Sequence, residues 1–324
     1  MFTLEQAREL HRKLPVFDLR VPGADDPLTR AYLDHYQLSG MSAPYPVRHS
    51  MGSFPCLDFR LAGHHFAVPD EVCTGTLVIV HGYYDHVGLY RHPIEYGLGR
   101  GLSVLTFDLP GHGLSGGDPA SIRSFDHYSQ ALVDCLTVAR EQGLAGPLLL
   151  MAQSTGAAAV INILVKKQRF PIPDFSQILL LAPLLRPVDW VSSLRKFHLM
   201  RWFLRKVDRT FAVNSHDEEF LRFIAEDDPL QARDLMVDWV AALRQYLKEF
   251  DVAANQDDRL DIIQGTDDTT VDWQYNLPRL RHKFPRACTH TIDGARHHLV
   301  NESSRYRQKL FDLVDDILDG KVDS

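Results

Sequence analysis

The chain has 324 residues, of which 45% are hydrophobic, and it carries a formal net charge of −7 at pH 7. This composition is ordinary for a globular protein with a large buried core, and the length suits one α/β domain with an insertion. The negative charge argues against a nucleic-acid-binding protein, and the longest apolar stretch, residues 178–185, is too short to cross a membrane.

The cysteines and the N-terminus indicate the compartment. The cysteines at positions 56, 73, 135 and 288 form no C-x-x-C pair, so we interpret them as free thiols in a reducing environment. Residues 1–20 are charged throughout and have no apolar core of the kind found in secretory signals. We therefore expect a soluble cytoplasmic protein, and the sequence leaves peripheral contact with the inner face of the membrane open.

Residues 1–56 are irregular in pattern and are interrupted by six prolines. Hydrophobic spacing predicts short helices near residues 4–14 and 28–36, followed by an extended lead-in. We treat this segment as an N-terminal extension.

From residue 57 onward, strand and helix patterns alternate. Apolar or alternating runs predict strands at residues 57–67, 76–80, 102–107, 148–152, 178–182, 260–264 and 287–292. A helix is predicted to begin at Ser124 and end near Gly143, and a closing helix has its apolar face within residues 306–317. The alternating first strand is predicted to be antiparallel, and the remainder predicts a mainly parallel sheet with helices on both faces.

The alternation stops between residues 187 and 256. This region has no strand-like run but has two or three helical stripes. A helical block inserted between two strands of a parallel sheet is typical of a lid, and we call residues 187–256 the cap. The predicted core then comprises residues 57–186 and 257–324.

Residues 148–159 (LLLMAQSTGAAA) join an apolar strand to a run of small residues through a polar Gln-Ser-Thr turn. A sharp strand-to-helix turn of this kind is a nucleophile elbow, which exposes one serine hydroxyl at the edge of the sheet. The backbone segments approach closely there, and Gly156 with the alanines after it keeps the side chains small. Ala152 replaces the first glycine of the usual G-x-S-x-G pattern. We therefore predict Ser154 as the nucleophile.

Residues 113–117 (GLSGG) match the G-x-S-x-G letters but lie in a different context. They follow a Pro-Gly-His sequence several residues after a strand and lead into Asp118 and Pro119, not into a helix. A motif counts only in its structural context. We therefore interpret Ser115 as a loop residue.

A serine hydroxyl needs an adjacent base that is itself oriented by an acid. In hydrolases with a nucleophile elbow, the acid and then the base follow the serine on loops after later strands. The loop after the strand at 260–264 contains Asp267, Asp268 and Asp272, and the loop after the last strand contains the neighbours His297 and His298. Spacing alone does not separate these candidates.

The tetrahedral intermediate of acyl transfer needs hydrogen-bond donors for its oxyanion. The backbone N–H after the nucleophile, here that of Thr155, is one donor, and the loop after an earlier strand provides the other. Tyr83 follows the strand at 76–80, and Gly82 lets the backbone turn toward the substrate, so the N–H of Tyr83 is the predicted second donor. We interpret His81 as a residue that anchors this loop.

Several stretches resemble motifs of the lysophospholipase and monoacylglycerol lipase family of serine-aminopeptidase-like hydrolases. Residues 81–90 (HGYYDHVGLY) resemble its HG-x-x-E-H-x-x-x-Y stretch, with Asp85 where the family has Glu, and residues 108–115 (DLPGHGLS) resemble its D-x-x-G-H-G-x-S loop. Asp228, Pro229 and Leu230 resemble the D-P-L of its cap. The G-x-x-D pattern falls on Gly265 and Asp268, and the A-x-H pattern followed by L-x-N-E falls on Ala295, His297, Leu299, Asn301 and Glu302.

The resemblance covers most of residues 75–305. It implies an α/β-hydrolase fold with an inserted helical cap, no cofactor or metal, and hydrolysis of ester bonds in monoacyl lipids or related small esters. It also selects Asp268 and His297 from the open candidates. The implied site is Ser154, Asp268 and His297, with the N–H groups of Tyr83 and Thr155 as oxyanion donors.

The cap contains a basic segment between residues 190 and 211. Its basic residues, interleaved with apolar ones, are Arg195, Lys196, Arg201, Arg205, Lys206 and Arg209. A basic amphipathic helix can lie on an anionic membrane surface or contact a phospholipid headgroup, although a charge run is more often a solvated face. The apolar residues of the segment favour an acyl pocket under the cap.

Together these observations favour a serine carboxylic-ester hydrolase of the lysophospholipase or monoacylglycerol lipase type that forms an acyl-enzyme on a small ester or monoacyl lipid. A fold and a triad do not fix the substrate, so an aminopeptidase or a C–C bond hydrolase is the alternative. Glu218, Glu219, Glu226 and Asp227 in the cap leave an amine-binding site open. The presence of all three triad residues disfavours a non-catalytic interaction protein, and the oligomeric state is not indicated.

Overall fold

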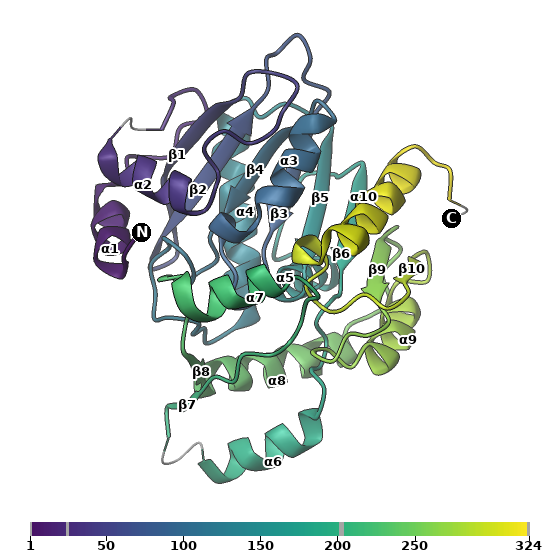
Figure 1. The fold of residues 1–324 in the computed structure, drawn as a ribbon. Coiled ribbons are helices and arrows are strands. Elements are labelled where there is room, and N and C mark those ends of the chain that lie inside the picture. Colours follow the sequence, from purple (N-terminus) through teal and green to yellow (C-terminus); the bar gives the residue numbers. More distant parts are fainter. Residues whose placement is uncertain (1, 24–25, 201–203, 323–324) are drawn as a thin grey trace.

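The centre of the fold is a sheet with the strand order β1-β2-β4-β3-β5-β6-β9-β10 (Figure 1). The computed structural model describes residues 2–23, 26–200 and 204–322, and for residues 196–200 it describes the backbone alone. The strands of this sheet are β1 (Arg48–Cys56), β2 (Phe59–Ala67), β3 (Thr76–Val80), β4 (Ser103–Phe107), β5 (Leu148–Gln153), β6 (Gln177–Leu181), β9 (Asp261–Gly265) and β10 (Cys288–Ile292). Only β1–β2 and β2–β4 are antiparallel among the described pairs of this sheet, which confirms the predicted mainly parallel α/β architecture.

Strand β1 lies where the sequence predicts only an extended lead-in. It pairs with β2 along its whole length, from Arg48 opposite Ala67 to Cys56 opposite Phe59. The prediction was wrong because serine, glycine, histidine and proline interrupt the apolar alternation of residues 48–56. The division of the chain into an extension at 1–56, a two-part core and a cap stays a prediction.

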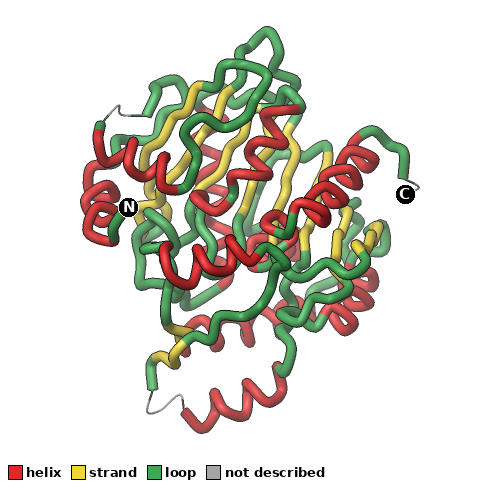
Figure 2. The backbone as a smooth tube through the Cα atoms, viewed as in Figure 1, coloured by secondary structure: helices red, strands yellow, loops and turns green. Residues whose placement is uncertain are grey.

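Helices cover both faces of the sheet (Figures 1 and 2). Their bounds are α1 (Leu4–Lys13), α2 (Pro27–His35), α3 (Arg91–Gly99), α4 (Phe125–Glu141), α5 (Thr155–Val165), α6 (Trp190–Met200), α7 (Glu218–Arg222), α8 (Val237–Val252), α9 (Trp273–Lys283) and α10 (Ser304–Leu318). Apolar side chains of α4, α5, α8 and α9 pack in one hydrophobic cluster, and those of α1, α2, α3 and α10 pack in a second cluster on the opposite face.

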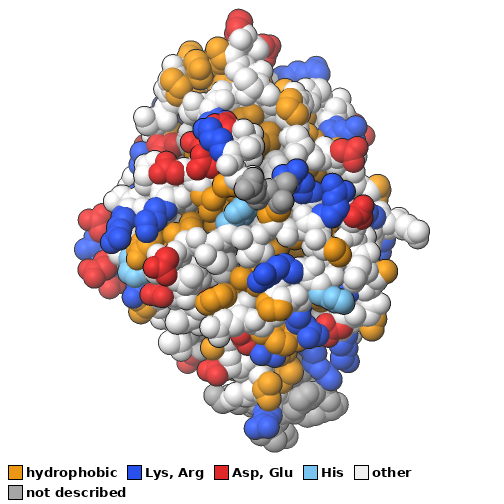
Figure 3. Space-filling model, turned by 90° about the vertical axis from the view of Figure 1, so that its right-hand side faces the viewer, with side chains coloured by type: hydrophobic (Ala, Val, Ile, Leu, Met, Phe, Trp, Pro, Cys, Tyr) orange, Lys and Arg blue, Asp and Glu red, His pale blue; other side chains and the backbone are white. Residues whose placement is uncertain are grey.

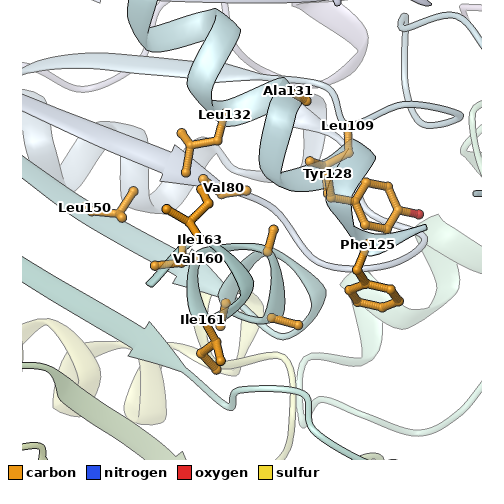
Figure 4. Close-up of a cluster of buried hydrophobic side chains, with 14 of the residues drawn as sticks. Val80, Leu109, Phe125, Tyr128, Ala131, Leu132, Leu150, Val160, Ile161 and Ile163 are labelled. Carbon is orange, nitrogen blue, oxygen red and sulfur yellow. The ribbon is translucent and has the colours of Figure 1, made fainter. Parts of the chain in front are cut away.

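Alternate residues of the central strands enter these two clusters. Val78 and Val80 of β3 pack with α4 and α5, whereas Leu77 and Ile79 enter the cluster on the other face. Figure 4 shows part of the first cluster, in which Val80 and Leu150 face side chains of the two helices. Because both faces are buried, these strands are mostly apolar.

The cap contributes α-helices, two short strands and a π-helical turn at one end of the sheet (Figure 1). Its three described helices α6, α7 and α8 match the two or three that the sequence predicts. Two short strands, β7 (Lys206–Asp208) and β8 (Asp234–Met236), also pair antiparallel there. The prediction that the cap has no strand was therefore wrong, because strands of three residues are too short to give a periodic signal. Residues Phe223–Asp227 form a π-helical turn after α7.

The fold places several loops at one edge of the sheet. Strands β3, β5, β9 and β10 run parallel to their neighbours, so their carboxyl ends meet on the side that the cap covers. Ligands of open α/β sheets bind at this edge. Within the described part of the chain, no helix combines the length and the apolar character that crossing a bilayer requires.

Candidate active site

Ser154 stands between the end of β5 and the start of α5 in a strained conformation. Its φ of 52° and ψ of −109° are unusual for a residue with a side chain. The turn is tight, since a Cβ added to Gly156 would lie only 2.4 Å from the carbonyl oxygen of Val80. Only glycine fits at that position, and Ala152 is accommodated as a buried residue of the core.

His297 joins Ser154 to Asp268. Its Nε2 lies 3.0 Å from the Ser154 hydroxyl, and its Nδ1 lies 2.7 Å from Oδ2 of Asp268. All three side chains are buried, although they come from loops after β5, β9 and β10. The structure thus brings together the three residues that the sequence predicts, as a hydroxyl, an imidazole and a carboxylate in line.

The alternative candidates lie in other environments. Asp267 is exposed, and Asp272 caps α9 and pairs with Arg186 at 2.6 Å. His298 points to Asp85, as described below, and not to Ser154.

The electrostatics of the three residues are coupled. Burial alone would lower the pKa of His297, but the Asp268 carboxylate beside it raises that pKa above its ordinary value. Burial would raise the pKa of Asp268, but the imidazole and other donors hold it below its ordinary value. Asp268 is therefore the anionic acceptor at neutral pH, so Nδ1 of His297 carries a proton. Nε2 of the neutral ring is then free to accept the proton of the Ser154 hydroxyl.

Two glutamines support this arrangement, and sequence reasoning missed both. Gln264 donates through Nε2 to Oδ2 of Asp268 at 2.9 Å. Gln153, the residue before Ser154, donates to the backbone oxygen of His297 at 2.7 Å. Neither glutamine stands in a pattern of its own, and the only signal for Gln153 is its place beside the predicted nucleophile.

The loop after β3 lies against Ser154. A Cβ added to Gly82 would lie 3.4 Å from Cβ of Ser154 and 2.7 Å from a carboxylate oxygen of Asp85, so the backbone passes here only as glycine. The N–H of Gly82 is directed to Tyr90 and Asp85. Tyr83 and Thr155 both line the cavity that contains Ser154. The N–H of Thr155 begins a helix and has no acceptor inside that helix.

His81 anchors the same loop. The proton on its Nδ1 is donated to the carbonyl oxygen of Gly82 at 2.8 Å, and its Nε2 accepts the N–H of Leu109 at 2.9 Å. Burial lowers its pKa to about 3, so the ring stays neutral. These bonds agree with the predicted anchoring role.

Ser115, the serine of the G-x-S-x-G match at residues 113–117, is bound to backbone groups. It lies in the loop after β4, where its hydroxyl donates to the carbonyl oxygen of Asp108 and accepts the N–H of Ala62 at 2.9 Å. The hydroxyl is therefore occupied by the backbone on both sides, as the interpretation of a loop residue requires.

Asp85 ties the loop after β3 to the loop after β10. Its Oδ1 lies 2.9 Å from Nε2 of His298, and its Oδ2 accepts the hydroxyl of Tyr90 at 2.9 Å. Burial would raise the pKa of Asp85, but His298 and the other donors hold it well below its ordinary value.

A second buried pair joins the cap to the core. Nε2 of His86 lies 3.0 Å from Oδ2 of Asp228, and Oδ1 of the same carboxylate accepts the hydroxyl of Tyr36 at 2.7 Å. Asp228 lies in the cap, His86 follows β3, and Tyr36 ends α2. The sequence motifs include Asp228 and His86, but nothing in the sequence signals Tyr36.

The Ser154 hydroxyl opens into a cavity of about 540 Å³ between the core and the cap. Its wall is mostly apolar and includes Leu184, Val188, Trp190, Leu235 and Trp239. Among the described residues, no three His, Cys, Asp or Glu side chains are grouped closely enough to hold a metal ion.

The basic segment of the cap is only partly described. Arg195 and Arg205 are exposed, and Lys206 pairs with Asp234 at 2.7 Å. Figure 3 shows Lys and Arg side chains among hydrophobic ones toward the cap end of the molecule. The predicted residues Arg201, Trp202 and Phe203 lie outside the described residues, as do the side chains of Lys196, Leu199 and Met200.

The sheet, the cap and the serine at the strand-to-helix turn define an α/β hydrolase. A sequence profile of the family described as serine aminopeptidase, S33 (Hydrolase_4) matches residues 72–304. The chain belongs to this family.

Two curated relatives and one solved structure agree with this assignment. A monoacylglycerol lipase of Mycolicibacterium smegmatis is 28% identical over 124 residues, which are 38% of this chain and 43% of the lipase. The phospholipase YtpA of Bacillus subtilis is 28% identical over 210 residues, which are 60% of this chain and 76% of that protein. A soluble variant of monoglyceride lipase from Saccharomyces cerevisiae has the same fold, with a TM-score of 0.71 at 16% identity over 87% of this chain and all of the lipase.

Proposed function

We propose that the protein is a serine carboxylic-ester hydrolase of the monoacylglycerol lipase or lysophospholipase type. The observation that carries the proposal is the line from the Ser154 hydroxyl through His297 to Asp268, which ends in a largely apolar cavity. A nucleophile, an oriented base and a pocket for an alkyl chain are the parts that hydrolysis of a fatty ester needs. The curated relatives named above, a lipase and a phospholipase, support the same class of substrate.

In the proposed mechanism, Oγ of Ser154 attacks the ester carbonyl while Nε2 of His297 takes its proton. Asp268 holds the proton on Nδ1 and stabilises the imidazolium that forms. The N–H groups of Tyr83 and Thr155 bind the oxyanion, and His297 then protonates the leaving alcohol. Water attacks the acyl-enzyme with the same base and releases the fatty acid.

The fit of the substrate follows from the cavity. Leu184, Trp190 and Trp239 provide apolar surface for one acyl chain, which is worth about 0.8 kcal/mol for each buried methylene. A monoacyl ester therefore gains more from this site than an acetyl ester does.

The aminopeptidase alternative would need carboxylates that bind a free amine in the cavity. Within the described part of the chain, none of the cap residues Glu218, Glu219, Glu226 and Asp227 lines the cavity that contains Ser154. Among the described residues, the carboxylates that do line it are Asp85, whose two oxygens bind His298 and Tyr90, and Asp208. An amine site in this cavity would therefore depend on Asp208 alone, which favours an ester over an amino-terminal substrate. A C–C bond hydrolase remains the alternative on the same scaffold.

The test is a screen of the purified protein against p-nitrophenyl esters of short and long acids, lysophospholipids, monoacylglycerols and amino-acid anilides. We expect turnover of esters that increases from acetyl to medium-chain acyl groups, and its loss in Ser154→Ala. A fluorophosphonate probe should label the wild-type protein and not the variant. Retention of full activity by Ser154→Ala, or turnover of anilides alone, would overturn the proposal.

The expected membrane contact and the cytoplasmic location stay predictions. The exposed Arg195 and Arg205 support a test with vesicles, in which sedimentation with anionic vesicles and not with neutral ones is the expected result. Equal sedimentation with both kinds, or with neither, would contradict it.

A further inference from the structure

Arg209 places a partly buried guanidinium in the wall of the cavity that contains Ser154. Its Cζ lies 3.8 Å from the ring centre of Tyr84 and 4.2 Å from that of Phe211, so the group is held between two aromatic rings. Such stacking fixes the plane of a guanidinium and leaves its edges open.

The edge of Arg209 that carries Nε and Nη2 is open. Nη1 donates to Oε1 of Gln231 at 2.7 Å and to the carbonyl oxygen of Ala232 at 3.1 Å. The three N–H bonds on Nε and Nη2 have no acceptor among the residues that the structure describes. This edge presents two parallel N–H bonds, the arrangement that binds two oxygens of a phosphate or a carboxylate.

No carboxylate forms an ion pair with Arg209 in the part of the chain that the structure describes. Asp234 pairs with a lysine, and both oxygens of Asp85 are occupied by other donors. Asp208, which ends β7 beside Arg209, also lines the cavity but makes no ion pair with this guanidinium. Burial lowers the pKa of Arg209, and the opposing effects of Tyr84, Asp85 and Tyr83 do not restore it to its ordinary value.

Gln231 connects this guanidinium to the loop that carries Tyr83. Its Nε2 donates to the carbonyl oxygen of Tyr84 at 3.0 Å, while its Oε1 accepts from Arg209. The cation is thus fixed relative to the residues beside the Ser154 hydroxyl. One cavity therefore offers an apolar wall, a nucleophile and a guanidinium with an open edge and no ion-pair partner.

We propose that the substrate is an anionic amphiphile, namely a monoacyl ester whose alcohol part carries a phosphate, and that Arg209 binds this phosphate. The proposal rests on the proposed ester hydrolysis and names the charge of its substrate. The acyl chain then lies along the apolar wall, and the phosphate receives the N–H bonds of Nε and Nη2. A neutral monoacylglycerol would leave the Nε and Nη2 edge of this partly buried cation without an acceptor, which disfavours it relative to the phosphate ester.

The experiment compares two substrates with the same medium-length acyl chain, a monoacylglycerol and its phosphate monoester, both below their critical micelle concentrations. Arg209→Gln removes the cation, and Arg222→Gln is the matched control because Arg222 is an exposed cap residue that does not line the cavity. We expect wild-type kcat/KM to favour the phosphate ester, and Arg209→Gln to lose about 10- to 100-fold on that substrate alone. Added salt should reduce the wild-type preference, and Arg222→Gln should keep it.

A second measurement separates this proposal from the chemistry. Calorimetric binding of the two compounds to Ser154→Ala reports the phosphate preference without turnover, so it tests Arg209 even if ester hydrolysis proves wrong. Glycerol 3-phosphate, which has no acyl chain, should bind at least about tenfold more weakly than the acylated compound, since its buried methylenes are missing. The proposal is overturned if Arg209→Gln weakens both acyl compounds equally, if the wild type prefers the neutral one, or if glycerol 3-phosphate binds as tightly.

Discussion

Replacing Asp268 with Asn tests the proposed triad most directly, because the carboxylate uses each oxygen for a different purpose. Oδ1 accepts the backbone N–H groups of Thr270 at 2.8 Å and Val271 at 3.1 Å. Oδ2 accepts from Nδ1 of His297 at 2.7 Å and from Nε2 of Gln264 at 2.9 Å. The substitution leaves only one oxygen for these two sets of donors.

The backbone donors decide how the amide is oriented. Two N–H groups of the main chain cannot become acceptors, whereas His297 can move its proton from one nitrogen to the other. The amide oxygen should therefore stay with the backbone, and the NH2 group should face Nδ1 of His297. The proton of the imidazole then sits on Nε2, where it meets the Ser154 hydroxyl as a donor and no longer as a base. We expect kcat/KM to fall about 10⁴-fold, which corresponds to about 5 kcal/mol of transition-state stabilisation.

The pH profile gives an independent readout. His297 acts as a base only when it is neutral, so the wild-type rate should rise with pH through a midpoint above 6.5, because Asp268 raises the pKa of the imidazole. In Asp268→Asn that contribution is absent and burial lowers the pKa, so the midpoint should move below 6.5. The assay is kcat/KM for a soluble p-nitrophenyl ester, with the exposed Asp267→Asn as the matched control. A variant with wild-type kcat/KM, or with an unchanged midpoint, would refute this reasoning.

Three further changes probe the surroundings. Ser115→Ala should keep the activity and lower the free energy of unfolding by about 1–3 kcal/mol, because the N–H of Ala62 loses its acceptor; denaturant unfolding checks the cost, and loss of ester turnover would contradict the loop assignment. Gly156→Ala should destabilise the fold by about 1–3 kcal/mol, since its Cβ would lie 2.4 Å from the carbonyl oxygen of Val80, and an unchanged melting temperature would count against the tight turn. Burial would raise the pKa of Asp228, but the His86 imidazole and other donors lower it to about 2. The ionised carboxylate therefore stabilises the fold at pH values above its unfolded pKa, and this contribution is lost as the pH falls from about 4 to about 2. Asp228→Asn should therefore be less stable than the wild type near neutral pH, by about 3–5 kcal/mol for a broken buried pair. A difference in melting temperature that does not shrink in acid would show that the charge of Asp228 is not its cause.

The sequence predicts the strands that are buried on both faces and the loops at their ends. A run such as residues 76–80 buries all five residues, four of them apolar, only inside a covered parallel sheet, and this constraint fixes where the next loop begins. The order of serine, acid and histidine along the chain follows from the same topology. Residues 48–56 were missed as a strand because β1 lies at the edge of the sheet and has only one neighbouring strand. The amino-acid composition of such an edge strand is little constrained. Helix α3 was missed as well, because its proline and glycines mask the helical pattern.

The sequence pattern does not determine which of two adjacent residues belongs to the site. The preference for Asp268 over Asp267, and for His297 over His298, depends on which side of a loop faces the nucleophile. Spacing in sequence does not carry that information, and here a family resemblance supplied it. The structure separates the two histidines by their partners: one lies 2.7 Å from Asp268, and the other lies 2.9 Å from Asp85.

Side chains of residues 81–90 bind residues of two distant stretches of the chain, so the motifs in these stretches depend on one another. Asp85 binds His298, so the loop beside the nucleophile is fixed to the loop of the neighbouring His297. His86 binds Asp228, so the same loop is fixed to the cap. Two consecutive side chains thus hold three segments in register around one hydroxyl. A change that breaks either pair should loosen the loop after β3 and leave Ser154, His297 and Asp268 in place. We therefore expect it to lower kcat while labelling of Ser154 by a fluorophosphonate persists.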